Sequence, residues 1–393
     1  MVLDLGLQPL ANNLLRPEDL GRVEPCFPLR LFVCPGCWLL QITDLIPPTE
    51  LFSEYLYFSS FSEGMVQHAA KAAKRYQHDF RLCRESFVLE IASNDGYFLQ
   101  HFQQAGIPCL GIEPAANIAQ MANAKGIETI AEFFDAQFAE KLADERGQAD
   151  LILGNNVFAH APEINDFVAG LGKVLKPGGR LILEFPYAVD LIERTEFDTI
   201  YHEHVYYFSL TTLIPVFARH GLSVFHVERI PIHGGSLRIF AGHRGMHPEE
   251  TSVAQLLAGE RTLGVDALNY YESFARKVET VRESLRGLLA RLKREGASIG
   301  AYGASAKGST LLNFCGIGRE VIDFVADRSP HKQGRLMPGV HIPIIPADEL
   351  RPRMPDYTLL LTWNFAEEIM AQQRAYRDAG GKFVIPNPEV TVV

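Results

Sequence analysis

The sequence predicts an α/β protein with two mostly parallel sheets, which a long helical connector joins and a small N-terminal module precedes. Two stretches of the chain alternate short β-branched or apolar runs with amphipathic segments, a pattern typical of βαβ units. A third stretch between them repeats apolar residues at helical spacing. A chain of 393 residues is also too long for one ordinary core. We therefore expect a module over 1–65, an α/β domain over 66–245, a connector over 246–296 and a second α/β domain over 297–393.

The first α/β domain is predicted from short apolar runs that turn signals separate. Two late runs, Ser223–Val227 and Leu237–Ala241, are expected to close the sheet as a hairpin-like pair. Before them, the segment from Lys176 to Gly179 combines a helix stop with a turn. The remaining expected strands are Phe87–Ile91, Cys109–Ile112, Ile127–Ile130, Leu151–Leu153 and Arg180–Phe185.

The connector is predicted as helix from Thr251 to Glu295, with a possible break at Gly264, because its apolar side chains recur at helical spacing. A second βαβ pattern follows it. The expected strands of this second pattern are Ile299–Tyr302, Val321–Val325, Tyr357–Leu361 and Lys382–Ile385.

Composition is that of an ordinary globular protein, with 47% hydrophobic and 21% charged residues. The formal charge of -10 argues against a nucleic-acid partner, since such surfaces usually need a basic face. No run of about 18 apolar residues is present, so we expect no contact with a membrane core. The chain start lacks a signal pattern and the six cysteines suggest no disulfide framework, which favours a cytoplasmic location. Both a monomer and a small homo-oligomer are compatible with the sequence.

A ligand site is predicted where the first expected strand ends. Glu90 closes this strand, and a turn through Ala92, Asn94 and Gly96 leads to a helix expected near Tyr97. Such a turn brings backbone N–H groups close to a ligand. The G-x-G-x-x-G pattern of dinucleotide sites is absent. Glu90 would repel a pyrophosphate, whereas the cationic S-adenosylmethionine would suit it.

Two later polar residues extend this ligand site. Glu113 follows the second strand, where an acid can bind ribose hydroxyls, and Asn155 lies at the carboxyl end of the fourth. Glu90 and Glu113 could instead be solvated turn residues. The order of all these marks along the chain nevertheless indicates a class I methyltransferase domain that binds S-adenosylmethionine.

A proton-handling site is predicted beside the methyl donor. Tyr201, Glu203 and His204 follow the fifth strand, and His160 follows the fourth. Both loops should open at the carboxyl edge of the sheet, where a positioned base contributes on the order of 10²–10⁴-fold. These side chains favour methylation of carbon, since a C–H bond must be broken before a nucleophile exists.

Two other interpretations of this segment remain open. His202 and His204 could bind a metal, although the pattern H-E-x-x-H is absent because Tyr206 occupies the second His position. The segment could also be a buried polar network that shapes a loop, in which case each titratable side chain would need a partner.

Several ordered blocks of sequence then suggest a family. These blocks are Leu5-Gly6-Leu7-Gln8-Pro9-Leu10-Ala11-Asn12, Cys34-Pro35-Gly36-Cys37, Tyr55-Leu56-Tyr57-Phe58-Ser59-Ser60, Glu90 to Gly96, Tyr201-His202-Glu203-His204, His233-Gly234-Gly235-Ser236-Leu237-Arg238, Tyr302 to Gly308 and Asp327 to Gly334. As a set, they resemble the S-adenosylmethionine-dependent C-methyltransferases of nucleotide-linked deoxysugars. The resemblance runs essentially from Val2 to the C-terminus.

The resemblance implies a zinc-binding N-terminal module, a Rossmann-like donor domain and a C-terminal Rossmann-like domain that helps to hold the sugar nucleotide. It implies methylation at carbon 3 of a dTDP- or related nucleotide-linked 4-keto-6-deoxy sugar. The His matching His204 is the favoured base of the family, and the residues matching Tyr55, His160, Tyr201 and Glu203 line the reacting sugar.

The roles fit general chemistry. His204 would take the proton that the neighbouring ketone acidifies, and Tyr201 or His160 would donate a hydrogen bond to the developing oxyanion. Glu203 would orient the imidazole. The matching blocks also suggest substrate contacts by Tyr57, Ser236 and Arg238. Tyr55 and Tyr57 could alternatively belong to the core.

The metal site departs from the family pattern. The family uses two C-x-x-C pairs, a strong zinc signal when both are present, and only Cys34 and Cys37 remain here. The chain begins almost where the first pair should end, so the start could be either truncated or miscalled. Either the two thiols keep half of a zinc site, or they pack as small hydrophobes in a relic turn.

The second α/β domain offers a candidate phosphate site. The loop that contains Ser305 and Lys307 resembles a phosphate cradle, although the order Lys-Gly-Ser is not that of a Walker A loop. It could equally be a structural strand-to-helix turn. His331 and Lys332 could meet a diphosphate, or they could be solvated.

Three functions therefore compete. The first is the sugar-nucleotide C-methyltransferase. The second is an O- or N-methyltransferase acting on another small molecule, which would leave the proton-handling residues underused. The third is a protein that binds donor or sugar nucleotide without chemistry.

Overall fold

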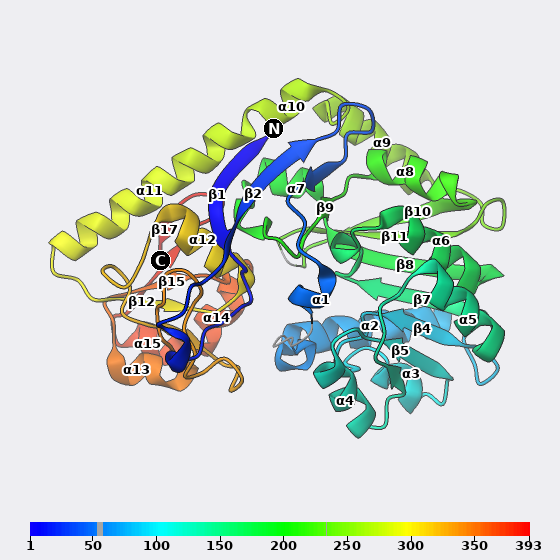
Figure 1. Cartoon of the computed structure of the whole chain (residues 1–393), viewed down its shortest axis with the longest axis horizontal. Helices are drawn as coiled ribbons and strands as arrows, with labels where there is room; N and C mark the ends of the chain where they lie inside the picture. The colour runs from blue at the N-terminus through cyan, green and yellow to red at the C-terminus, as the bar shows by residue number, and fades with distance from the viewer. Residues whose placement is uncertain (53–57, 233) are drawn as a thin grey trace.

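A computed structural model describes residues 1–52, 58–232 and 234–393. These residues form three sheets, and Figure 1 shows two α/β lobes with the N-terminal strands running between them. The expected α/β class, with a methyltransferase-type sheet, a small N-terminal module and a second Rossmann-like domain, is confirmed.

The methyltransferase sheet has the strand order β10-β11-β8-β7-β4-β5-β6. The strands β6, β5, β4, β7 and β8 pair in parallel, and β11 and β10 close the sheet in antiparallel fashion. Their bounds are β4 (Val88–Ile91), β5 (Cys109–Ile112), β6 (Thr129–Ile130), β7 (Ala149–Asn155), β8 (Leu175–Pro186), β10 (Leu222–Ile230) and β11 (Ser236–His243).

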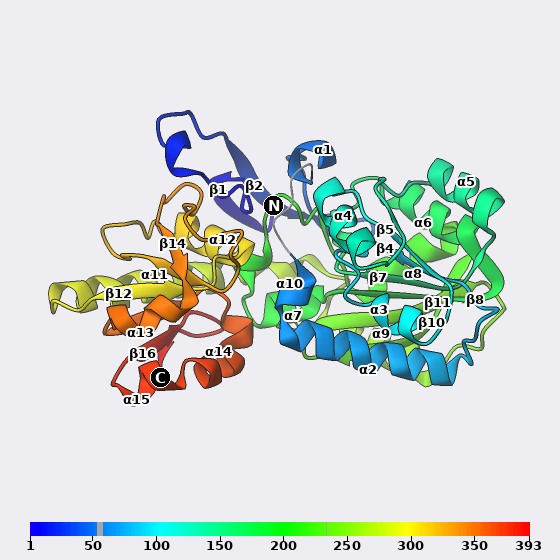
Figure 2. The ribbon, with the colours of Figure 1, turned by 90° about the horizontal axis from the view of Figure 1, so that it is seen from below.

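Helices cover both faces of this sheet, and Figure 2 shows α2 along one face with α5 and α6 on the opposite side. Two separate apolar clusters fill the two faces, which explains why the central strands are buried throughout. The helices are α2 (Glu63–Asp79), α3 (Gln100–Gln104), α4 (Ala116–Ala124), α5 (Ala136–Arg146), α6 (Ile164–Val174), α7 (Ala188–Glu193), α8 (Leu210–Arg219) and the 3₁₀ turns η3 (Phe158–His160) and η4 (Phe197–Thr199).

Three local expectations need correction. The segment from Lys176 to Gly179 lies within β8 rather than in a turn before it, because Leu175 already pairs with Ala149 of β7. The next pair is Arg180 with Leu151, so the intervening residues bulge out of the ladder. The first helix begins at Gln100 rather than near Tyr97. The run Val321–Val325 is mostly loop, and its strand begins at Val325.

The connector consists of α9 (Thr251–Leu263), α10 (Leu268–Glu272) and α11 (Phe274–Arg294). The expected break at Gly264 is confirmed, since this residue ends α9 in the left-handed conformation with φ 82°. Along α11 the buried side chains recur every three or four residues, as an amphipathic helix requires. They are Phe274, Val278, Val281, Leu285, Leu289 and Leu292.

The C-terminal sheet has the order β14-β13-β12-β15-β16-β17, in which β17 alone pairs antiparallel within the described residues. Its strands are β12 (Ile299–Tyr302), β13 (Val325–Asp327), β14 (Ile344–Pro346), β15 (Tyr357–Leu360), β16 (Lys382–Ile385) and β17 (Thr391–Val392). Its helices are α12 (Ala306–Cys315), α13 (Leu350–Arg353), α14 (Ala366–Gln372) and α15 (Arg374–Asp378), with the 3₁₀ turns η5 (Ala347–Glu349) and η6 (Trp363–Phe365).

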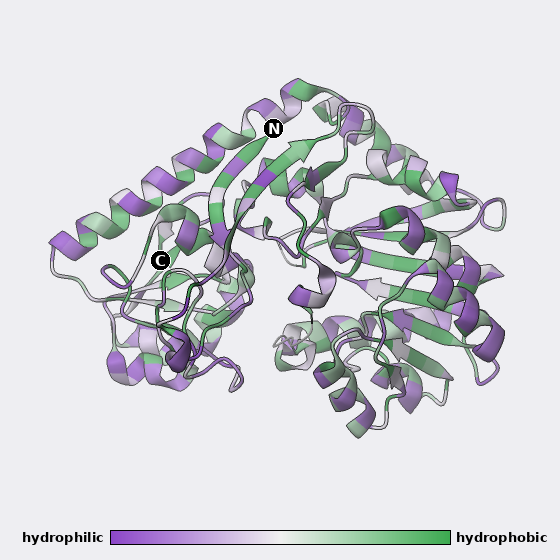
Figure 3. Cartoon of the chain, in the orientation of Figure 1, coloured by the Kyte–Doolittle hydropathy of each residue, from purple (hydrophilic) through white to green (hydrophobic). Residues whose placement is uncertain are grey.

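The N-terminal sheet draws its fourth strand, β9 (Tyr206–Tyr207), from the segment that follows the proton-handling motif. One apolar cluster joins side chains of this sheet with α7, α11 and the C-terminal sheet. In Figure 3 the central strands of the methyltransferase sheet are mostly hydrophobic, whereas α11 alternates hydrophilic and hydrophobic residues. The other elements here are β1 (Leu3–Pro9), β2 (Cys26–Val33), β3 (Leu40–Ile42), α1 (Pro48–Leu51), η1 (Pro17–Asp19) and η2 (Ser59–Phe61). Among the described residues, no helix combines the length and apolarity that a membrane span would need.

Candidate active site

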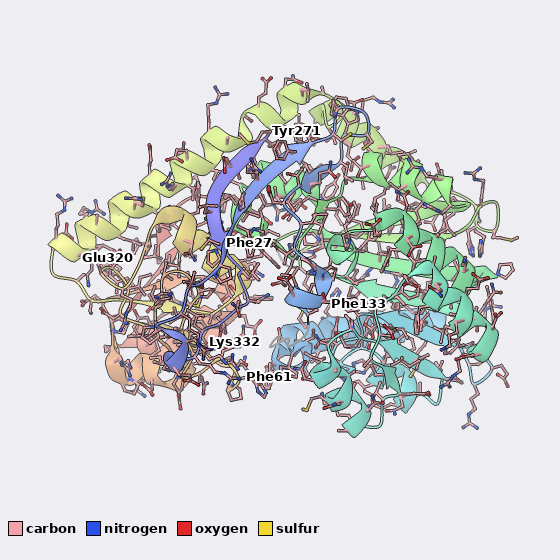
Figure 4. All side chains as sticks on the ribbon, in the orientation of Figure 1. Phe27, Phe61, Phe133, Tyr271, Glu320 and Lys332 are labelled. Atoms are coloured by element: carbon pink, nitrogen blue, oxygen red, sulfur yellow. The ribbon has the colours of Figure 1, made fainter. Side chains whose placement is uncertain are left out.

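A cavity of about 650 Å³ lies between the two α/β domains. Its lining includes Asn12 of the N-terminal module, Asn94 and Glu113 of the methyltransferase sheet, and Ser305 of the C-terminal domain. Figure 4 labels Phe133 on the methyltransferase side and Lys332 on the C-terminal side, and both residues line this cavity. The cavity therefore joins regions that lie far apart in the sequence.

The donor turn follows β4 and is held in an unusual backbone conformation. Ala92 and Asn94 have φ values of 53° and 50°, which place both residues in the left-handed region. The Asn94 N–H donates to Glu113 Oε2 at 3.0 Å, and the Ala115 N–H donates to Oε1 of the same carboxylate at 3.0 Å. Glu113 thus fixes the turn, and together with Ala92, Asn94 and Asn155 it lines the cavity.

Glu90 and Gly96 flank this turn, and neither of them lines the cavity. A Cβ atom on Gly96 would lie 2.4 Å from Ile127 Cδ1, so only glycine fits there. Glu90 is 1% exposed, and neither of its carboxyl oxygens has a hydrogen-bond partner among the described residues. Burial raises its pKa well above the ordinary value, and the neighbouring Glu113 raises it further.

These observations fit a cationic donor. A buried carboxyl group without a partner is costly, and a nearby positive charge would stabilise its ionised form. Ala92, Asn94, Glu113 and Asn155 would hold S-adenosylmethionine in the cavity, with Glu90 behind them. Phe133 also lines the cavity and was not predicted, although an acid followed by two aromatic residues soon after the third strand was a usable signal.

His204 sits in the cavity wall with both ring nitrogens engaged. Nδ1 lies 2.9 Å from the Thr199 carbonyl oxygen, which only accepts, so Nδ1 carries the proton. Nε2 lies 2.9 Å from the Tyr201 hydroxyl and accepts its hydrogen bond in the neutral ring. This tautomer leaves the basic lone pair of His204 on Nε2, beside a hydroxyl group that also lines the cavity.

His160 lies next to this pair, with its ring centroid 4.8 Å from that of His204 in an edge-to-face arrangement. Phe52 covers its other side at 5.5 Å. Burial lowers the pKa of His160 to about 4, against the opposing effect of the backbone at Glu203 and Asn156. The imidazole of His160 is therefore neutral at physiological pH.

Glu203 contacts the N-terminal module. Its predicted role was to orient the His204 imidazole, whereas the Thr199 carbonyl oxygen engages Nδ1 and Glu203 Oε1 accepts from Asn12 Nδ2 at 2.7 Å. Glu203 therefore ties the N-terminal module to the segment that carries the base. No local signal marked Asn12 or Thr199 for these contacts.

The metal interpretation of this segment is not supported. His202 Nε2 donates to the Pro28 carbonyl oxygen at 3.2 Å and faces β2, away from the partners of His204. In the ranges that the structure describes, no group of three or more His, Cys, Asp or Glu side chains could hold an ion.

The C-terminal wall of the cavity carries the positive charge. Lys307 and Lys332 line it together with Ser305 and Asp327. Ser305 Oγ caps α12 by accepting from the Gly308 N–H at 3.1 Å. Lys307 Nζ lies 4.9 Å from the centre of the Trp363 ring, and Lys332 Nζ donates to the Ala304 carbonyl oxygen at 2.7 Å.

Three predicted substrate residues lie elsewhere. Arg238 is buried and pairs with Glu184 at 2.6 Å and Glu228 at 2.9 Å, so its charge is used within the domain. Ser236 is fully buried and donates to a backbone carbonyl oxygen. His331 is exposed and packs against Phe58 at 4.8 Å. None of the three lines the cavity. The polar groups of Arg238 and Ser236 are used within the domain, whereas a substrate contact by His331 stays a prediction. Tyr55 and Tyr57 lie outside the described residues.

The cysteine pair forms half of a zinc site. Hydrogen bonds from the backbone at Gly36 and Cys37 lower the pKa of Cys34, whereas burial raises that of Cys37. A structural zinc takes four ligands, and the described residues offer no third ligand beside these two. The residues present therefore do not fit a complete zinc site.

Three family models match the chain. "C-methyltransferase C-terminal domain" matches residues 231–388, "Methyltransferase domain" matches residues 66–227, and "Putative zinc binding domain" matches residues 1–52.

Known relatives agree with these models. The chain is 39% identical over 393 residues to C-methyltransferase NovU of Streptomyces niveus. This match covers 100% of this chain and 94% of that protein. A ubiquinone biosynthesis O-methyltransferase of Chelativorans sp. (strain BNC1) is 27% identical over 97 residues, or 24% of this chain and 38% of that protein. Among solved structures, magnesium protoporphyrin IX methyltransferase (ChlM) from Synechocystis PCC 6803 with bound SAM matches with a TM-score of 0.35 and 16% identity. That match covers 45% of this chain and 79% of the ChlM chain.

The fold and the donor site define a class I methyltransferase. The full-length similarity then identifies the family, and the chain belongs to the S-adenosylmethionine-dependent C-methyltransferases.

Proposed function

We propose that the protein methylates carbon 3 of a dTDP- or related nucleotide-linked 4-keto-6-deoxy sugar, after removing a proton from that carbon. The single observation that carries this proposal is the His204 tautomer. Its Nδ1–H donates to Thr199, so the basic lone pair is on Nε2, where it accepts from the Tyr201 hydroxyl in the cavity wall. An oxygen or nitrogen acceptor already carries a lone pair to alkylate, whereas a carbon acceptor has none until a base has removed its proton.

The first step is proton removal. The carbonyl group of the substrate acidifies the neighbouring C–H bond, and His204 Nε2 takes the proton as the C–H electron pair moves into an enolate. The resulting imidazolium keeps its Nδ1–H bond to the Thr199 carbonyl oxygen, whose partial negative charge stabilises the cation.

The enolate oxygen needs donors. The Tyr201 hydroxyl, whose acceptor Nε2 is now protonated, is released to donate to that oxygen. His160 is neutral because burial lowers its pKa to about 4, so its one ring N–H is a second candidate donor. A single well-placed donor of this kind is worth roughly 3 kcal/mol.

The donor end of the cavity is acidic and the acceptor end is basic. When bound, S-adenosylmethionine supplies an electrophilic methyl group on a sulfonium. Ala92, Asn94, Glu113 and Asn155 would hold that donor. At the opposite end, Lys332 and the capped N-terminus of α12 would bind the diphosphate of the sugar nucleotide.

Incubation with a donor labelled in its methyl group tests the proposal against a panel of 4-keto-6-deoxy sugar nucleotides. The expected product carries the label on carbon 3 of the sugar, read by NMR. Label on a sugar oxygen or an amine, with none on carbon, would contradict the proposal.

A further inference from the structure

The segment that holds the base is anchored by the C-terminal domain. We infer that Trp363 and Thr310 are positioning residues, which keep the Thr199 carbonyl oxygen in place and through it the orientation of the His204 imidazole. This inference rests on the proposed role of His204 as the base.

The link to the base is a single backbone carbonyl group. Thr199 is the last residue of η4, and its oxygen lies 2.9 Å from His204 Nδ1. A displacement of this peptide would let the imidazole turn or change its tautomer. Misplacing a reacting group by about 1 Å can cost roughly 100-fold in rate.

Two hydrogen bonds from the other α/β domain hold this peptide on either side of Thr199. Trp363 Nε1 donates to Asp198 Oδ2 at 2.6 Å, and Thr310 Oγ1 donates to the Ile200 carbonyl oxygen at 3.3 Å. Trp363 belongs to η6 and Thr310 to α12, so both donors come from beyond the connector.

The hydrogen bond from Trp363 to Asp198 is important because the Asp198 carboxyl group is completely buried and cannot bond to water instead. Among the residues that the structure describes, its other oxygen Oδ1 has no hydrogen-bond partner. Losing the indole N–H would leave the buried group without its strongest neutral donor, so the η4 turn would have to rearrange. Burial raises the Asp198 pKa, and the nearby Lys307 charge opposes that rise.

The anchor also adjoins the acceptor end of the cavity. Lys307 Nζ lies over the Trp363 ring at 4.9 Å, and Thr362 and Asn364 on either side of Trp363 line the cavity. The C-terminal domain therefore contacts the substrate space with one set of side chains and the base-holding turn with another. Trp363 and Thr310 lie behind the wall and do not line the cavity themselves.

Trp363→Phe tests the inference, because it keeps an aromatic ring beside Lys307 while it removes the indole N–H together with part of the ring volume. Thr310→Val, which is nearly isosteric, removes the second donor without that loss of volume. We expect kcat to fall roughly 10- to 100-fold while KM for the methyl donor stays nearly constant. The acid limb of the kcat profile should move to lower pH, since the imidazolium loses the carbonyl oxygen that stabilises it. Thr310→Val should give a smaller change in the same direction.

Asp198→Asn is the matched control, since its amide oxygen can still accept from Trp363. It should retain more activity than Asp198→Ala. If Trp363 and Asp198 act through one hydrogen bond, the double variant Trp363→Phe/Asp198→Ala should lose little more activity than Asp198→Ala alone. ¹⁵N NMR of histidine-labelled protein should report a protonated Nδ1 at His204 in the parent and a weakened or shifted signal in Trp363→Phe.

The NMR signal needs no turnover, so it separates this inference from the proposed reaction. Unchanged kcat, pH profile and Nδ1–H signal in folded Trp363→Phe and Thr310→Val would overturn the inference. Failure of the parent to methylate any sugar carbon, with the NMR change still present, would overturn the proposed function alone.

Discussion

The turn after β4 and the turn after β12 share a construction. In the methyltransferase domain, the Asn94 N–H donates at 3.0 Å to Glu113, which follows the neighbouring strand β5. In the C-terminal domain, the Ala304 N–H donates at 2.7 Å to Asp327, which ends the neighbouring strand β13. Each turn is thus fixed by a carboxylate from the adjacent strand, and both turns line the same cavity.

The charges around the two turns are opposite. The first has the buried Glu90 behind it, whereas the second is flanked by Lys307 and Lys332. Topology decides where a parallel sheet keeps its ligand, and the side chains around the turn decide the ligand's charge. One cavity can therefore hold a cationic donor and an anionic acceptor at opposite ends.

Of the changes at the two turns, the largest expected effect concerns the basic end. Lys332→Met should raise KM for the sugar nucleotide roughly 10- to 100-fold, because a hydrogen bond to a charged group is lost. KM for the methyl donor should stay unchanged in steady-state assays.

A donor-side lysine serves as the control for this variant. Lys125 pairs with Asp95 at 2.8 Å and does not line the cavity. Lys125→Met should leave the sugar-nucleotide KM within about twofold. An equal rise in both KM values for Lys332→Met would break the division of the cavity into two ends.

Binding of the methyl donor at the acidic end of the cavity should depend on pH. Burial raises the Glu90 pKa well above its ordinary value, so in the free protein this carboxyl group keeps its proton to higher pH than a solvated glutamate does. A cationic donor favours the ionised form, so binding releases a proton and donor affinity rises with pH, by at most about tenfold per pH unit. Calorimetry in buffers of different ionisation enthalpy measures that proton.

Glu90→Gln should abolish this pH dependence of donor affinity. The affinity for the sugar nucleotide should not show this dependence, either in the parent protein or in the Glu90→Gln variant. Donor affinity that stays flat between pH 5 and pH 8 in the parent would show that Glu90 does not sense the donor's charge.

The smallest effect concerns the helix cap. Ser305→Ala removes the acceptor for the Gly308 N–H and should cost about 1 kcal/mol of unfolding free energy. Chemical denaturation measures this loss. The corresponding helix of the donor domain, α3, has no side-chain cap, so no equivalent variant exists there. Unchanged stability of Ser305→Ala would show that the Ser305 cap does not distinguish the two turns energetically.

Much of the fold could be predicted from short-range pattern. The runs at Cys109–Ile112, Ile299–Tyr302 and Lys382–Ile385 became strands with those bounds, because buried parallel strands need continuous apolar residues. The pairing of β3 with β9 could not be predicted, because a two-residue strand has no periodicity of its own.

The site divides in the same way. Glu113 and His204 were predicted because one follows a strand end and the other stands in a dense polar motif, and both line the cavity. Asp327 also stands where a parallel strand ends, as Glu113 does, but it was not predicted as a site residue. The contacts of Trp363 with Asp198 and of Asn12 with Glu203 join residues 165 and 191 positions apart, and no local pattern reports such contacts.

Arg238 illustrates the opposite error. Its motif suggested a substrate contact, yet the buried Glu184 and the partly buried Glu228 already neutralise it. A charged residue in a recognisable motif is a binding residue only if its charge remains available at the cavity.

Solvent exchange at the substrate carbon tests the central claim most directly. In D₂O without methyl donor, the folded parent should incorporate deuterium at the carbon next to the sugar ketone, and His204→Gln should lose at least roughly 100-fold of that rate. Exchange at the parent rate in a folded His204→Gln protein would contradict the assignment of His204 as the base.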